Sequence, residues 1–215
     1  MSSDVAWRYG RPTIGGLARI FARPMAFGAD RVPATGGLVY AINHLHWIDI
    51  PVVGVLSPRN IDYVAKVEAM KYPGVGDFIR QFGTIAVRRG ESDRDAVRLM
   101  REAARDGRVP STNSPTTRQR SGRPGHAQPG AAMVALQEDV PVVPIAIYGS
   151  QFWRIGNFAP CSVAFGEPLT FPGLPRNGRG YKEATAEIER RINVLFDWLA
   201  DVHVRGREPG LVPPV

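Results

Sequence analysis

The chain has 215 residues, of which 44% are hydrophobic, and this length fits one domain with a sizeable core. The 27 Lys and Arg exceed the 20 Asp and Glu by seven, so the pI is about 10.1. A basic balance indicates an anionic partner such as a membrane surface or a phosphorylated molecule, and the scattered arginines argue against a nucleic-acid tail. The single cysteine, Cys161, excludes an internal disulfide and a cysteine-based metal site, and no apolar run is long enough to span a membrane.

Strand-like and helix-like segments alternate along the chain, which predicts an α/β fold. Residues 1–10 are expected to form a frayed tail. Residues 14–27 read as a short amphipathic helix, which either packs on the domain or lies in a membrane interface. Strands are predicted at 37–42, 61–66, 83–89, 140–149 and 162–169, and helices at 49–56, 67–82, 92–107, 129–139 and 182–203. We therefore expect a single-domain α/β sandwich with a mixed, largely parallel sheet over residues 31–208, preceded by segment 1–30 and followed by a tail at 209–215.

The stretch NHLHWID, residues 43–49, carries the clearest candidate chemistry. His44 would lie just past the end of a strand, where open α/β sheets place their sites, and Asp49 would begin the next helix. A tight turn can bring the Asp49 carboxylate to one imidazole nitrogen, so that the other nitrogen takes a proton from an acceptor hydroxyl. No Gly-x-Ser-x-Gly elbow is present, which favours direct transfer over a covalent intermediate. On residue types alone, a purely structural His44 is an equal alternative, and His46 reads as structural or pocket-lining.

Four blocks in the same order and spacing resemble the glycerolipid acyltransferases, the family of 1-acylglycerol-3-phosphate acyltransferases. NHLHWID resembles the His-x4-Asp motif, and GTIAVRR (83–89) resembles the second block. TRQRSGRPG with the following GAAMVAL resembles the end of the third block, and VPVVPIAI (140–147) resembles the fourth. The resemblance implies transfer of a fatty acyl group from acyl-coenzyme A or acyl-carrier protein to the hydroxyl of a lysophospholipid, with 1-acylglycerol-3-phosphate as the first candidate.

The resemblance also implies roles for individual residues. His44 and Asp49 become the catalytic pair, and the expected substrate-binding residues are Asn43, Arg89, Thr117 and Arg118. A guanidinium such as that of Arg89 suits a phosphate group. We expect no metal and no cofactor apart from the thioester co-substrate, and no nucleic-acid partner. The expected place of the enzyme is peripheral, on the cytoplasmic face of the cell membrane, in phospholipid biosynthesis.

Residues 108–118, RVPSTNSPTTR, depart from the third block, which typically reads Phe-Pro-Glu-Gly-Thr-Arg after an apolar strand. Alignment on Arg118 keeps Thr117 but puts Pro115 and Thr116 in place of the Glu and the Gly. Pro110 cannot donate to a central ladder, and buried Ser, Thr and Asn side chains need partners. The strand before Pro115 is therefore expected to be poorly formed.

The reverse complement of this segment restores the block. With CG-type Arg and TC-type Ser codons, inversion turns RVPSTNSPTTR into Arg-Val-Val-Gly-Glu-Phe-Val-Glu-Gly-Thr-Arg without a change of length. The hypothesis is that residues 108–118 are an inverted version of an intact block, which resequencing of the locus tests. There are two alternatives to an active acyltransferase. The altered third block favours a catalytically impaired lipid- or membrane-binding relative. Separately, His44 and Asp49 could activate water in a hydrolase.

Overall fold

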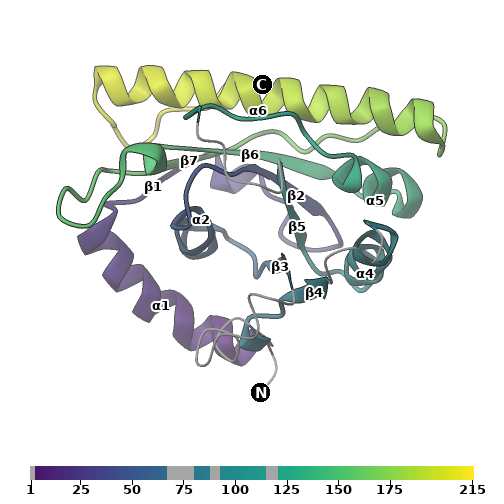
Figure 1. Ribbon diagram of the computed structural model, residues 1–215, viewed down its shortest axis with the longest axis horizontal. Helices are drawn as coiled ribbons and strands as arrows, with labels where there is room; N and C mark the ends of the chain where they lie inside the picture. The colour runs from purple at the N-terminus through teal and green to yellow at the C-terminus, as the bar shows by residue number, and fades with distance from the viewer. Residues whose placement is uncertain (1–2, 67–79, 88–92, 115–120) are drawn as a thin grey trace.

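A seven-stranded sheet forms the centre of the computed structural model, which describes residues 3–66, 80–87, 93–114 and 121–215 (Figure 1). Its strands, in the order in which they lie side by side, are β1 (Met25–Phe27), β7 (Ser162–Phe165), β6 (Val142–Tyr148), β2 (Val39–Asn43), β5 (Pro110–Ser114), β3 (Asp62–Lys66) and β4 (Ile85–Val87). Neighbouring strands are parallel except β6 and β7. The carboxyl ends of β2 to β6 therefore meet at one edge, and the predicted mixed, largely parallel sheet is confirmed.

Helices cover both faces of the sheet. On one face lie α1 (Ser3–Phe21) and α2 (Asp49–Leu56), and on the other lie α4 (Asp93–Arg105), α5 (Gly130–Glu138) and α6 (Gly178–Arg205), the last of which runs along the length of the molecule (Figure 1). Strand β2 alternates between the two layers, since Tyr40 packs with the α1–α2 cluster and Ala41 with the α4–α6 cluster. Burial on both faces explains why this strand reads as a continuous apolar run.

The amino-terminal segment differs from the prediction. Helix α1 begins at Ser3, so residues expected to form a frayed tail belong to a regular helix. Trp7 is buried against α2, its Nε1–H donates to the Phe82 carbonyl at 3.3 Å, and the two rings meet edge to face at 4.9 Å. These contacts join residues 75 positions apart, which local sequence pattern does not reveal. Strand β1 was not predicted either, and most of the predicted helix 67–82 lies outside the described residues.

Strand β5 forms in the centre of the sheet, so the expectation of a poorly formed strand is wrong. Ser111 lies in register between Tyr40 of β2 and Tyr63 of β3. Pro110 is the first residue of the strand, a position that tolerates proline, and the ladder is continued there by the Asp62 amide, which donates to the carbonyl of residue 109 at 2.8 Å. The Ser111 hydroxyl is buried without a hydrogen-bond partner among the described residues, which costs about 1–3 kcal/mol.

Asp62, at the start of β3, gives a testable dependence of stability on pH. Burial raises the pKa of this carboxyl to about 6, although the guanidinium of Arg108 pairs with it. A carboxyl with a raised folded-state pKa stabilises the protein below its unfolded pKa, and that contribution is lost as the pH rises through 6. Asp62→Asn has no carboxyl to ionise, so it does not lose this stability as the pH rises. The unfolding free energy of the variant minus that of the unchanged chain is therefore expected to be about 2 kcal/mol larger at pH 7.5 than at pH 4.5, measured by urea unfolding. An equal difference at both pH values would contradict the assignment.

Candidate active site

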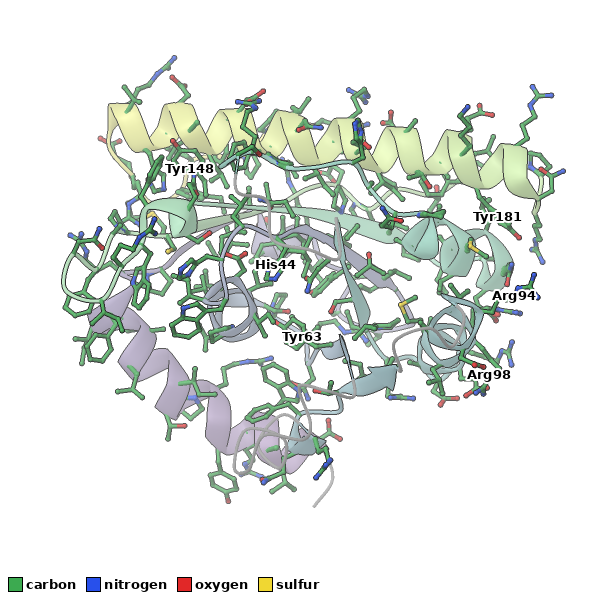
Figure 2. All side chains as sticks on the ribbon, in the orientation of Figure 1. His44, Tyr63, Arg94, Arg98, Tyr148 and Tyr181 are labelled. Atoms are coloured by element: carbon green, nitrogen blue, oxygen red, sulfur yellow. The ribbon has the colours of Figure 1, made fainter. Side chains whose placement is uncertain are left out.

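The loop after β2 brings His44 and Asp49 together at the carboxyl edge of the sheet. Figure 2 labels His44 in the interior of the molecule, beside α2. The His44 Nδ1 lies 2.9 Å from the Asp49 Oδ2, and both side chains are buried. The same oxygen accepts the backbone N–H groups of Leu45 at 2.7 Å and His46 at 2.8 Å. Three donors on one oxygen close the loop and fix the carboxylate at the first turn of α2, so the contact predicted from the spacing is present.

This geometry determines what the imidazole can do. A carboxylate accepts hydrogen bonds, so the His44 Nδ1 carries the proton that it donates to Asp49. In the neutral imidazole with this tautomer, Nε2 carries a free lone pair that can accept a proton from a substrate hydroxyl, and Asp49 would stabilise the resulting imidazolium. The loop thus has the geometry that a histidine base with an orienting carboxylate requires, and the catalytic roles of His44 and Asp49 stay predictions. The second oxygen of Asp49, Oδ1, is buried without a partner among the described residues.

Asn43, the last residue of β2, holds this loop to β6. It is fully buried, its Oδ1 accepts the Ile147 N–H at 2.7 Å, and its Nδ2 donates to the Ile147 carbonyl at 3.1 Å. The side-chain amide therefore continues the β2–β6 ladder beyond the last backbone pair, at the residue before His44. The predicted substrate-binding role of Asn43 stays a prediction, and the structure adds a positional role that the sequence did not indicate.

Replacement of Asn43 by alanine is expected to lower the free energy of unfolding by about 2–4 kcal/mol. The change removes two hydrogen bonds and leaves the buried N–H and carbonyl of Ile147 unpaired, each at about 1–3 kcal/mol in a rigid site. Urea unfolding monitored by circular dichroism measures the loss. Asn193→Ala is the matched control, since that amide donates to a carbonyl within its own helix; a similar loss in both variants would contradict the role of Asn43.

An aromatic cluster borders the loop. The Trp153 ring, after the short 3-10 helix η3 (Ser150–Phe152), lies 5.6 Å from the His46 ring and 5.5 Å from the Trp47 ring. Its Nε1–H donates to the carbonyl of Phe21, the last residue of α1, at 2.7 Å. His46 thus packs in an aromatic cluster beside the loop, and its predicted structural or pocket-lining role stays a prediction. Trp153 was missed, because its neighbours come from three separate segments.

The remaining predicted binding residues, Arg89, Thr117 and Arg118, lie outside the described residues, and their roles stay predictions. The described part of the basic loop begins at Ser121. There Arg123 pairs with Asp197 at 2.7 Å and lies over the Phe196 ring at 5.6 Å, so this guanidinium fastens the loop to α6.

Other features of the described residues set the context of the site. Burial raises the pKa of the Cys161 thiol to about 12, which agrees with the position of this side chain in the core. Within residues 3–66, 80–87, 93–114 and 121–215 no cluster of three or more His, Cys, Asp or Glu side chains could hold a metal ion. None of the described helices is long and apolar enough to cross a membrane. Cavities of about 340 and 180 Å³ lie at the amino edge of the parallel strands, away from His44.

Comparison with known proteins places the chain. The family model described as Acyltransferase matches residues 26–148, which include β2, the His44–Asp49 loop and β6. The chain belongs to the acyltransferase family. It is 26% identical over 177 residues to a 1-acyl-sn-glycerol-3-phosphate acyltransferase of Bacillus subtilis, a match that covers 79% of this acyltransferase and 86% of that protein. It is 31% identical over 113 residues to a lyso-ornithine lipid O-acyltransferase of Pseudomonas aeruginosa, which covers 51% of this chain and 42% of that one.

A solved structure shares the fold. The crystal structure of the 1-acyl-sn-glycerophosphate acyltransferase PlsC from Thermotoga maritima superposes with a TM-score of 0.71 at 19% identity. The match covers 96% of this acyltransferase and 81% of that chain. The predicted family, fold class and enzyme class are therefore confirmed.

Proposed function

We propose that this acyltransferase moves a fatty acyl group from an acyl thioester, acyl-coenzyme A or acyl-carrier protein, to the hydroxyl of a lysophospholipid. 1-Acylglycerol-3-phosphate is the first candidate acceptor, as in the named relative from Bacillus subtilis. The observation that carries the proposal is the 2.9 Å contact between the His44 Nδ1 and Asp49. His44 Nε2 takes the proton of the acceptor hydroxyl, and the hydroxyl oxygen bonds to the thioester carbonyl carbon. The carbon–sulfur bond then breaks, and the leaving sulfur takes that proton from His44 and departs as the thiol.

Location at the cytoplasmic face of a membrane, in phospholipid biosynthesis, is part of the same proposal. Helix α1 supports it, since the helix is apolar on two sides: Trp7 packs inward, while Tyr9, Leu17 and Ile20 face outward. The net charge of +7 suits a surface of anionic lipids. An outward apolar side next to arginines is typical of helices that lie in the interface of a membrane.

An acyl-transfer assay over a panel of lysolipids tests the proposal. The panel holds 1-acylglycerol-3-phosphate, a lyso-ornithine lipid and a neutral monoacylglycerol, each with acyl-coenzyme A and acyl-carrier protein as donors. Release of thiol together with formation of the diacyl product supports acyl transfer. Free fatty acid released without an acceptor would instead indicate a hydrolase, and the rank order of acceptors identifies the lipid class.

A catalytically impaired lipid-binding relative is the second candidate. The observation that favours it is the presence of Pro115 and Thr116 where the family block has Glu and Gly. Binding of lysolipid or vesicles without thioester turnover would support this candidate. Turnover by the unchanged chain would exclude it.

A further inference from the structure

Exposed apolar side chains gather at one end of the molecule, beside the loop that carries His44. They are Ile20, Phe21, Trp47, Phe152 and Ile155, here called the apolar rim, and they expose between 41% and 86% of their surface. They come from the end of α1, the loop before α2, and the segment around η3. In Figure 1 the end of α1 lies next to the loop that follows η3. Contiguous apolar patches on soluble proteins commonly mark an interaction site.

Trp153 joins the parts of the apolar rim into one surface. Its buried ring contacts Trp47 at 5.5 Å, and its Nε1–H holds the Phe21 carbonyl at 2.7 Å. Phe158 closes the gap between α1 and the η3 loop, with its ring 5.1 Å from Phe21 and 6.4 Å from Trp153. The rim is therefore a supported surface, and the ring contact between Trp153 and His46 places it next to the His44–Asp49 loop.

The two stretches that supply most of the apolar rim carry charge of one sign. In these stretches, residues 5–29 and 140–166, the sequence has no Asp or Glu. Arg19, Arg23 and Arg154 are exposed on these stretches. Aromatic and aliphatic side chains flanked by arginines match the interface of an anionic bilayer, where the rings enter the headgroup region and the guanidinium groups meet phosphate.

We infer that the apolar rim docks on the surface of an anionic lipid bilayer. The η3 loop then contacts the bilayer in addition to α1. The inference rests on the proposed function, because a lipid acceptor would reach His44 from the same bilayer. The contact is made by Phe152 and Ile155 on the η3 side and by Trp47 beside the catalytic loop. A bilayer bound there lies against the segment of Trp153, whose ring contacts His46 of the His44–Asp49 loop.

Sedimentation of the full chain with vesicles tests the inference. Vesicles of phosphatidylglycerol and phosphatidylcholine are expected to bind it more tightly than vesicles of phosphatidylcholine alone. Phe152→Ser with Ile155→Ser is expected to lower the partition coefficient about ten-fold, since two apolar side chains no longer leave water. The matched control is Val212→Ser with Val215→Ser, two comparably exposed side chains on the carboxyl-terminal tail, for which no change is expected.

Fluorescence and sedimentation velocity decide the other outcomes. Brominated lipids are expected to quench the wild-type tryptophan emission, and less so in Trp47→Phe. Undiminished binding by the Phe152/Ile155 pair, or an equal loss in the Val212/Val215 pair, would overturn the inference. The inference would also be overturned if the wild type does not bind vesicles but forms dimers that the Phe152/Ile155 change dissociates. That result would assign the rim to self-association. His44→Ala is expected to bind vesicles like the wild type, so a failure of the catalytic proposal is distinguishable.

Discussion

Replacement of His44 by alanine is expected to lower kcat for acyl transfer by a factor of about 10²–10⁴, the range that a general base contributes. The change removes the imidazole held by Asp49, which in the proposed mechanism takes the acceptor's proton. Because His44 is not among the residues proposed to bind substrate, KM is expected to change little. Steady-state release of thiol in the presence of 1-acylglycerol-3-phosphate measures both constants. The assay is run in the unchanged chain and in a chain that carries RVVGEFVEGTR at residues 108–118, so that a damaged third block does not hide the effect.

Two further variants make the His44 prediction specific. Asp49→Asn is expected to lower kcat by about 10²-fold or more, because an amide no longer holds the Nδ1 proton in place and the tautomer is lost. His126→Ala is the matched control, because His126 is exposed and pairs with Glu189 on α6, away from the site. Full transfer by His44→Ala, or an equal loss in His126→Ala, would refute the role of His44 as base.

Most of the fold could be predicted from the sequence, because the hydrophobic pattern within a segment decides whether most of these segments form a strand or a helix. The predicted strand at 37–42 and the predicted helices at 92–107 and 182–203 agree with β2, α4 and α6 to within a few residues. Errors fell where distant contacts decide the outcome. Helix α1 begins early because Trp7 packs against Phe82, and β1 exists only because it pairs with β7.

The site divides in the same way. The contact between His44 and Asp49 could be predicted, because five residues of chain and a strand-to-helix turn constrain the two side chains. The role of Asn43 as a clamp on Ile147 and the position of Trp153 could not, since both depend on which strand lies beside β2 and where α1 ends. Sequence pattern alone does not give the order of strands within a sheet.

Strand β5 shows how tertiary context overrides local composition. Its residues Pro110–Ser114 have low strand propensity, yet β2 and β3 on either side supply a ladder on both edges. The free energy of closing the sheet outweighs the unfavourable composition, and the cost remains as the unpaired Ser111 hydroxyl. Under the inversion hypothesis, the loss of function is therefore expected to come from residues 115–118 more than from the fold.

Replacement of residues 108–118 by the reverse-complement sequence is the second large expected effect. A chain with RVVGEFVEGTR at residues 108–118 is expected to transfer acyl groups at least about ten-fold faster at low acceptor concentration, equivalent to ~1.4 kcal/mol of transition-state binding. The resemblance implies that the Glu of the third block helps to hold the acceptor phosphate, and the change returns this Glu and the Gly beside it. The free energy of unfolding is expected to rise by about 1–3 kcal/mol, since Ser111→Gly removes the unpaired hydroxyl and Pro110→Val returns a strand donor.

Partial restoration separates the two effects. Pro115→Glu with Thr116→Gly alone restores the acceptor-binding residues and leaves β5 unchanged, so it is expected to raise kcat/KM with little change in unfolding free energy. Pro110→Val with Ser111→Gly alone is expected to raise stability with little change in kcat/KM. If neither pair nor the full segment raises acyl transfer, the inversion hypothesis loses its functional support and the impaired lipid-binding relative becomes the better description. A gain confined to the Glu–Gly pair would instead place the whole functional defect of this acyltransferase at two residues of the acceptor pocket.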